Sequence, residues 1–360
     1  MAVAYGDAVT VTSSDRMRAY RMTAWGRPPE LVEVPVPSAG AGQAVVRVAG
    51  CGLCHSDLAM MAMPGDVGEA LGWQLPFTLG HETAGWVHEV GEGVSMVAVG
   101  DAVAVVSPSS CGTCRSCRAG HENRCERGLV GRGYGRDGGL ADYVLVDGVD
   151  RALFALPDGL APHLAGPLTD AGATSMHAVR RLLAALPDAD QPAIVVIGAG
   201  GLGAFAIQFL RALAPEAVVL AVDPDPTRRD LAIELGARRS IPSVTDIADA
   251  EAGDVLGVLD FVGTDDTIRA GTRALSGGGV FGLVGAAGGT LRRPWYGTLP
   301  RDGTVFTFQN SDRSDLRQVL DLAASGLVQV LVEEFRLADV APAYEALEAG
   351  GLRGRILVRP

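Results

Sequence analysis

The sequence has no long hydrophobic run, few aromatic residues and no block of basic residues. Its apolar stretches, such as residues 193–197, are far too short to cross a bilayer, so we expect no membrane association. Aromatic residues make up only 5% of the 360 residues, and the formal net charge is −12 with the basic residues scattered. Because phosphate backbones are bound by clustered Lys and Arg, nucleic acid is not an expected partner.

The amino-terminal segment also lacks the features of a targeting signal. Residues 1–14 have neither a basic start nor a long apolar segment, so we expect no secretory peptide and a cytoplasmic location. Residues 1–16 are polar, which predicts a loose extension before a folded part that starts near Met17. The length exceeds that of one ordinary core and predicts two domains.

The local pattern changes character near residue 170. Before it, short β-branched segments such as 45–48, 85–90 and 102–106 alternate with Gly, Pro and Asp, which predicts an antiparallel, barrel-like β domain. After a helix expected over 171–186, continuous apolar strands alternate with helical segments, as in a parallel sheet covered on both faces. The strands are expected at 193–197, 218–222, 255–262, 280–284 and 305–308, and the helices at 204–213, 227–235 and 267–275. The fold class is therefore α/β, and we expect residues 311–360 to complete the first domain.

A glycine motif follows the first of these apolar strands. Gly198, Gly200 and Gly203 form G-x-G-x-x-G at the start of a helix, with Gly201 and Leu202 between them. Such a loop lets the backbone approach a pyrophosphate, and the helix N-terminus offers free N–H groups. The alternative is a glycine-rich turn that binds nothing, because a chain with 48 glycines can match this pattern by chance.

An acidic residue at the end of the next apolar strand favours a dinucleotide. Asp223 lies twenty residues after Gly203, where a carboxylate would bind the ribose hydroxyls and repel a 2′-phosphate. NAD is therefore expected rather than NADP. Arg228 and Arg229 lie close by and weaken this preference, because an arginine can accommodate the phosphate.

Four cysteines lie within fifteen residues. Cys111, Cys114, Cys117 and Cys125 can close a tetrahedral shell around a structural zinc ion, in a lobe expected at about 108–128. Buried thiols, disulfides or an iron–sulfur cluster are the alternatives.

A second set mixes sulfur, nitrogen and oxygen ligands. Cys54 and His81 offer the thiolate and imidazole that are common at catalytic zinc, where a position stays open for water or substrate. Asp170, at the junction of the two halves, is the candidate third ligand.

These motifs resemble the zinc-containing alcohol dehydrogenases of the medium-chain family, especially bacterial enzymes that act on secondary alcohols. The resemblance covers about 17–360, and six motifs carry it: 52–57, 80–82, 111–125, 167–172, 198–203 and 352–358. It implies a Rossmann doubly wound cofactor domain at 172–311. A β-rich, GroES-like catalytic domain would comprise 1–171 and 312–360.

The resemblance also implies roles for individual residues. Cys54, His81 and Asp170 would hold the catalytic zinc, with Glu82 behind the metal and Asp57 orienting His81. Ser56 would accept the alcohol proton. His55 and Arg353 would approach the pyrophosphate, and Thr174, Val284 and Gly285 the nicotinamide.

Two positions depart from the family pattern. Many relatives carry Cys where this chain has Asp170, and some carry a proton-relay His where it has Ala59. The relay beyond Ser56 is therefore expected to run through the ribose and water, or through His55.

The expected activity is reversible hydride transfer between an alcohol and NAD, giving a ketone or aldehyde, with two zinc ions per chain and a homodimer or homotetramer. The resemblance implies a secondary alcohol, and the small Ala59 and the polar Gln309 and Asn310 suggest a pocket open to aryl or otherwise bulky substrates. A polyol or formaldehyde dehydrogenase, a zinc-free quinone reductase and a non-catalytic NAD- or zinc-binding protein are the alternatives. Structural roles are expected for Cys51, His88, His121, His163 and His177. A place in the core and a contact with substrate or another subunit are equally expected for Trp73, Trp295 and Tyr296.

Overall fold

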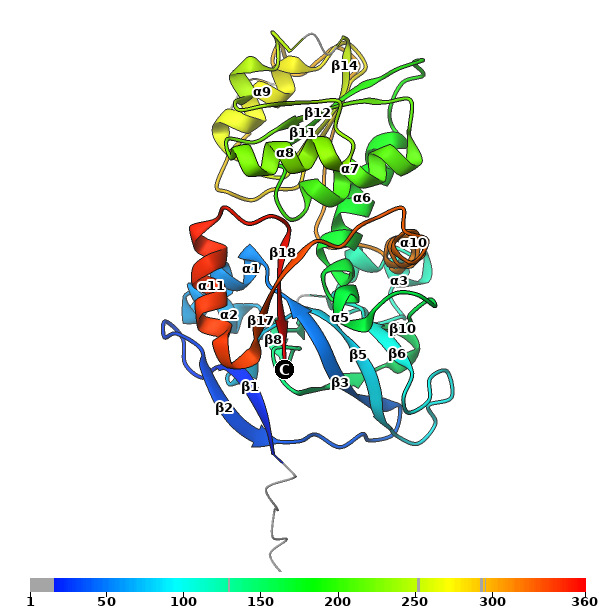
Figure 1. Cartoon of the computed structure of the whole chain (residues 1–360), viewed down its shortest axis with the longest axis vertical. Helices are drawn as coiled ribbons and strands as arrows, with labels where there is room; N and C mark the ends of the chain where they lie inside the picture. Colours follow the sequence, from blue (N-terminus) through cyan, green and yellow to red (C-terminus); the bar gives the residue numbers. More distant parts are fainter. Residues whose placement is uncertain (1–15, 129, 251–252, 292–293, 295) are drawn as a thin grey trace, which may run out of the picture.

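The computed structural model describes residues 16–128, 130–250, 253–291, 294 and 296–360. The extension expected before Met17 therefore lies almost wholly outside the described residues, as does Trp295. Figure 1 shows two halves stacked along the long axis, with helix α6 (Ala171–Leu183) running between them. Among the described residues, no helix is both long and apolar enough to cross a bilayer.

The upper half is built on a six-stranded parallel sheet with the order β13-β12-β11-β14-β15-β16. Alternate residues of its central strand serve two different cores: Ile194 and Val196 pack with α6 and α7, whereas Val195 and Ile197 pack with α9. Both faces are buried, which explains the continuous apolar sequence. The elements are β11 (Ala193–Ile197), α7 (Gly203–Leu213), β12 (Val218–Val222), α8 (Pro226–Leu235), β13 (Arg239–Ile241), β14 (Val255–Asp260), α9 (Asp265–Ala274), β15 (Val280–Leu283) and β16 (Thr304–Thr307).

Side-chain hydrogen bonds move two boundaries away from those expected. Strand β14 ends at Asp260 because its carboxylate accepts the N–H groups of Val262 and Gly263, which turns the chain. Helix α9 starts at residue 265 rather than 267 because Thr264 and Thr267 cap each other's backbone.

The lower half contains a seven-stranded sheet with the order β10-β6-β5-β3-β18-β17, in which β9 also pairs with β3. Its pairings are antiparallel except that of β17 with β18, which are parallel because helix α11 connects them. The elements are β3 (Gln43–Gly52), β5 (Glu82–Val90), β6 (Ala102–Val105), β9 (Tyr143–Asp147), β10 (Leu153–Ala155), β17 (Val332–Arg336), α11 (Val340–Ala349) and β18 (Arg355–Arg359).

The carboxyl-terminal segment thus returns to the lower half. Strand β18 pairs with β3 through Leu357 and Val358, and Figure 1 shows it at the centre of that half. This pairing supports the division that we propose, with 1–171 and 312–360 in one domain and 172–311 in the other.

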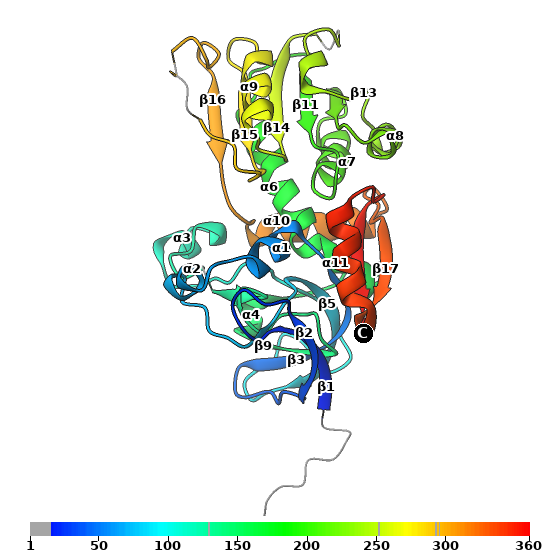
Figure 2. The ribbon, with the colours of Figure 1, turned by 90° about the vertical axis from the view of Figure 1, so that its left-hand side faces the viewer.

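Shorter elements complete the lower half and the junction. A three-stranded sheet has the order β2-β1-β4, and β7 pairs with β8. Helix α10 packs against α6 beside the junction (Figure 2). The elements are β1 (Arg16–Met22), β2 (Glu30–Pro35), α1 (His55–Met61), α2 (Gly65–Ala70), β4 (Phe77–Thr78), α3 (Arg115–Arg118), β7 (Gly131–Arg132), β8 (Gly135–Arg136), α4 (Val149–Ala152), α5 (Pro162–Ala165) and α10 (Arg313–Ala324).

Candidate active site and cysteine lobe

The mixed ligand set comes together at the start of α6. Ligand atoms of Cys54, His81, Glu82 and Asp170 all lie within 4.8 Å of one another. The 3.5 Å between His81 Nε2 and Asp170 Oδ2 is close to the ~3.4 Å that separates two ligands of a tetrahedral zinc ion. The donor types and their spacing therefore fit a zinc ion.

Asp57 fixes the orientation of two of these ligands. Cys54 caps the start of α1, and its N–H donates to Asp57 Oδ2 at 3.0 Å. Asp57 Oδ1 lies 3.1 Å from His81 Nδ1, and both side chains are completely buried. A carboxylate on Nδ1 leaves Nε2 free to bind a metal.

The charges around the site favour ionisation of its two acidic ligands, Cys54 and Asp170. Burial opposes ionisation of Cys54, but the hydrogen bond with His81 and the charge of Arg355 lower the pKa of the thiol to about 7. Burial likewise opposes ionisation of Asp170, but its hydrogen bond with His81, the charges of His81 and Arg355 and a hydrogen bond from Thr174 together outweigh burial, so the pKa of Asp170 is lowered. Deprotonated ligands are the form that zinc binds.

Glu82 lies beside this set in a buried ion pair with Arg355. Gly52 on the neighbouring strand makes room for it, since a Cβ there would lie 2.0 Å from Glu82 Oε2. Burial raises the pKa of Glu82 well above its usual value. In the described part of the chain Oε2 has no hydrogen-bond partner, so one acceptor oxygen remains available.

Ser56 lies at the same site and contacts a residue that the sequence analysis missed. Its Oγ is 3.4 Å from His81 Nε2 and 3.2 Å from Tyr134 Oη. Tyr134 lies in a glycine-rich stretch without a motif, so no signal pointed to it. Thr174, one turn into α6, lies with its Oγ1 3.4 Å from Asp170 Oδ1.

The glycine loop connects β11 to α7 and approaches this site through Arg355. A Cβ on Gly203 would lie 1.8 Å from the carbonyl oxygen of Gly198, so the turn can close only on glycine. A Cβ on Gly201 would lie 2.5 Å from Arg355 Nη1. Leu202 precedes α7, and its carbonyl accepts the hydroxyl of Ser175 at 2.9 Å.

Asp223 is buried at the end of β12 and holds two backbone groups. Its Oδ2 accepts the N–H of Ala199 at 2.9 Å, and its Oδ1 accepts that of Asp225 at 3.0 Å. Arg228 Nη1 lies 3.9 Å from Oδ2, whereas Arg229 donates to the carbonyl oxygen of Asp223. Arg228 is therefore the arginine on the carboxylate side.

The structure does not bring Arg353 to the glycine loop. Arg353 is half exposed and pairs with Glu234 on α8, while Arg355 takes the position beside Gly201. Two arginines in Leu352-Arg353-Gly354-Arg355 could not be told apart by sequence. Their placement depends on the turn at Gly354, whose φ is 122°.

Three further predicted cofactor residues lie around the loop. His55 on α1 is partly exposed and partly buried, and this partial burial, followed by the charges of Arg355 and Arg228, lowers its pKa. The N–H groups of Val284 and Gly285 both donate to the carbonyl of Asp260 at 2.9 Å.

The four remaining ligand-type cysteines converge in a separate lobe. The sulfurs of Cys111, Cys114, Cys117 and Cys125 lie within 4.8 Å of one another. Backbone N–H groups point at three of them, for example that of Cys114 at the sulfur of Cys111, 3.3 Å away. A hydrogen bond from Thr113 lowers the pKa of Cys111 to about 5, which favours the thiolate. This donor set fits a closed, structural zinc site.

Comparisons with known proteins match this architecture. The model of the alcohol dehydrogenase GroES-like domain matches residues 40–158, and that of the zinc-binding dehydrogenase domain matches 235–358. The D-arabinose 1-dehydrogenase (NADP⁺) of Saccharolobus solfataricus is 31% identical over 96% of this chain and 98% of that protein. The chain belongs to the zinc-containing medium-chain alcohol dehydrogenases.

Two solved structures agree with that assignment. The alcohol dehydrogenase of Aeropyrum pernix has a TM-score of 0.85 and 31% identity, covering 95% of this chain and 100% of that one. The acetophenone reductase of Geotrichum candidum, solved in complex with NAD, has a TM-score of 0.83 and 27% identity, covering 96% and 98%. The expected fold, enzyme class and cofactors, zinc and NAD, are thereby confirmed.

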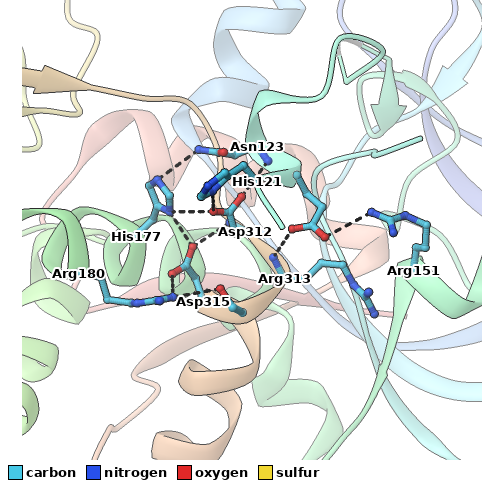
Figure 3. A network of polar contacts seen from close by, with 10 residues as sticks. His121, Asn123, Arg151, His177, Arg180, Asp312, Arg313 and Asp315 are labelled. Atoms are coloured by element: carbon cyan, nitrogen blue, oxygen red, sulfur yellow. Dashed lines mark hydrogen bonds and ion pairs between the residues drawn. The ribbon is translucent and has the colours of Figure 1, made fainter. Parts of the chain in front are cut away.

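In this dehydrogenase a polar network ties the cysteine lobe to the junction helices (Figure 3). Asn123, two residues before Cys125, donates from Nδ2 to His177 Nε2 at 3.3 Å, and its N–H donates to Asp312 at 3.1 Å. His177 Nδ1 lies 2.7 Å from Asp315, which also receives a hydrogen bond from Arg180. We call these five residues the lobe clamp.

The clamp contains a third group of metal-binding residue types, but its geometry is that of a hydrogen-bond network. His177, Asp312 and Asp315 are buried and close together. The 2.7 Å between His177 Nδ1 and Asp315 Oδ2 is a direct hydrogen bond, shorter than the ~3.4 Å between zinc ligands. Asp315 Oδ2 also caps α10 by accepting the N–H of Asp312.

Other residues of the dehydrogenase that were expected to be structural make ordinary contacts. Cys51 is buried, and burial raises the pKa of its thiol to about 12. Trp73 packs in the core against Phe77, whereas Tyr296 is largely exposed. The remaining histidines contact neighbours: His88 packs against the Tyr143 ring at a tilt, His121 lies near Asp312, and His163 lies near Glu334.

Proposed function

We propose that the enzyme transfers hydride reversibly between a secondary, aryl or otherwise bulky alcohol and NAD, forming a ketone or aldehyde. The observation that carries the proposal is the position of Ser56. Its hydroxyl lies 3.4 Å from His81 Nε2, within a set of one sulfur, one nitrogen and two carboxylates. A proton-accepting hydroxyl beside a metal-binding set is the arrangement that alcohol oxidation requires.

Cys54, His81 and Asp170 would hold the catalytic zinc. When bound, zinc supplies a Lewis acid that lowers the pKa of an alcohol or polarises a carbonyl. Asp57 keeps His81 oriented for this role, and Thr174 keeps Asp170 oriented. Glu82 offers a second carboxylate nearby, as a possible fourth ligand that is not required.

Ser56 would take the proton of the substrate hydroxyl and release its own proton to the next acceptor. In this chain Ala59 stands where some relatives carry a relay histidine. We propose that the proton leaves through the cofactor ribose and water, or through the exposed His55.

The cofactor would lie along the glycine loop. The N–H groups of Gly201 and Leu202, just before α7, and the guanidinium of Arg355 are the groups we assign to the pyrophosphate, with Arg355 replacing Arg353 in this role. Asp223 would bind the ribose, with Arg228 beside it. Thr174, Val284 and Gly285 would contact the nicotinamide.

The substrate class rests on the small Ala59, the polar Gln309 and Asn310, and one solved relative. That relative is named an acetophenone reductase, which supports a bulky or aryl ketone. The S. solfataricus protein is named for D-arabinose, so a polyol remains the second candidate.

A homodimer or homotetramer is the proposed assembly. Strand β16 forms an edge of the parallel sheet, as Figure 2 shows, and Val305 on it is 37% exposed. An unpaired edge can continue the sheet into a second copy. The cytoplasm is the proposed compartment, because the zinc-binding cysteines must stay reduced.

An absorbance screen at 340 nm tests the proposal. Protein loaded with two zinc ions per chain is mixed with NAD and with primary, secondary, aryl and polyol alcohols. We expect NADH formation that is fastest with secondary or aryl alcohols, whereas preference for a polyol or formaldehyde would move the assignment to that sibling enzyme. Zinc binding without NADH formation from any of them would refute the proposed activity.

A further inference from the structure

We infer that the Tyr134 hydroxyl is the positioning group for Ser56. The Tyr134 hydroxyl donates a hydrogen bond to Ser56 Oγ, so that the proton of Ser56 points away from Tyr134. This inference rests on the proposed function. Tyr134 lies outside the six sequence motifs and outside the glycine loop.

The geometry holds the two hydroxyls together. Tyr134 Oη lies 3.2 Å from Ser56 Oγ. The phenol ring lies against the His81 ring at 4.7 Å and against Trp73 at 6.1 Å between centroids. The Tyr134 backbone is fixed by two hydrogen bonds with Gly131, at 2.9 and 2.8 Å. The phenol is therefore anchored through its ring and through its backbone.

Zinc binding would leave Tyr134 as the polar partner of Ser56. In the described part of the chain, the two polar atoms within hydrogen-bond distance of Ser56 Oγ are His81 Nε2 and Tyr134 Oη. A zinc ion on His81 would occupy the Nε2 lone pair and end the contact with the imidazole. Ala59 on the same helix offers only a methyl group.

The chemistry of the two hydroxyls sets the direction of the bond. A phenol is a stronger acid than an aliphatic alcohol, so Tyr134 donates and Ser56 accepts. A serine oxygen has one proton and two lone pairs. One lone pair of Ser56 Oγ accepts the hydrogen bond from Tyr134, and the other lone pair accepts the substrate proton. The original proton of Ser56 then leaves to the next acceptor. Tyr134 keeps its proton throughout.

A double-mutant cycle on the zinc-loaded enzyme tests the inference. Tyr134→Phe keeps the ring and removes the hydroxyl. We expect kcat to fall about tenfold, the strength of one hydrogen bond, with the KM for the alcohol and the zinc content unchanged. In a Ser56→Ala background, Tyr134→Phe should cause no further loss, because the group that it positions is absent.

Two variants separate positioning from a general effect on folding. Ser56→Thr restores a hydroxyl, so the sensitivity to Tyr134→Phe should return. Tyr143→Phe removes a phenol hydroxyl on β9 and should leave kcat unchanged.

Either of two results would overturn the inference: wild-type kcat in Tyr134→Phe, or a tenfold loss that persists in the Ser56→Ala background. If the unmodified enzyme oxidises no alcohol, the proposed function fails and the inference fails with it. An active enzyme that is insensitive to Tyr134→Phe overturns the inference alone.

Discussion

Arg353 and Arg355 are two residues apart, yet their surroundings are opposite. The Arg353 side chain is 47% exposed and pairs with Glu234, which is 56% exposed. The Arg355 side chain is 6% exposed and pairs with Glu82, which is completely buried. Surface ion pairs contribute little to stability, whereas removing one partner of a buried pair leaves an uncompensated charge.

Alanine substitutions at these two arginines should therefore differ sharply. We expect Arg355→Ala to lower the free energy of unfolding by about 3–5 kcal/mol and to raise the KM for NAD. The matched Arg353→Ala should cost about 1 kcal/mol or less. Urea unfolding of the zinc-loaded proteins and NAD titration of the rate measure both effects. Equal effects of the two substitutions would contradict the assigned positions.

At the scale of single elements, α6 links the proposed metal site to the lobe clamp. Asp170 precedes its first turn, Thr174 contacts Asp170, and His177 lies one turn further on. Spacings of four and three residues put these side chains on one face of the helix. The cysteine lobe thereby contacts the same helix that presents Asp170.

Removing the clamp should loosen the cysteine lobe. His177→Ala leaves Asp315 and Asn123 without their shared partner, so we expect faster release of the lobe zinc to a colorimetric chelator. His163→Ala is the control, since the His163 imidazole lies 3.7 Å from the half-exposed Glu334 and is not part of the lobe clamp. Identical release rates in the two variants would show that the clamp does not hold the lobe.

At the scale of the whole molecule, the parallel sheet ends in an edge strand, β16, which we propose contacts a second copy of the chain. Among the described strands, β16 pairs with β15 alone, and Val305 on β16 is 37% exposed. Leu327, after α10, belongs to no strand of this sheet and is 63% exposed.

A charge at the edge should break the proposed assembly. We expect Val305→Glu to shift the protein to a smaller species in size-exclusion chromatography with light scattering, because like charges would face each other across the extended sheet. Leu327→Glu should leave the mass unchanged. An unaltered assembly in Val305→Glu would exclude the β16 edge as the interface.

The sequence predicted secondary structure best where a hydrophobic pattern corresponds to a single kind of burial. The strand at 193–197 is buried on both faces, so its five apolar residues match β11 to the residue. Boundaries set by side-chain caps were missed, as at Asp260 and Thr264, because a cap depends on local geometry. Arg355 and Tyr134 were missed because their importance comes from residues far away in sequence.

The amino-acid sequence by itself determined the glycine loop and the α/β class and predicted the four-cysteine set, because these depend on residue types at short spacings. The set of Cys54, His81 and Asp170 was predicted from residue types and family motifs and remains a proposal. The tertiary structure alone decided which arginine faces the glycine loop, which hydroxyl reaches Ser56 and which helices hold the cysteine lobe. Those contacts join segments more than fifty residues apart, and chain folding rather than local spacing brings them within hydrogen-bond distance.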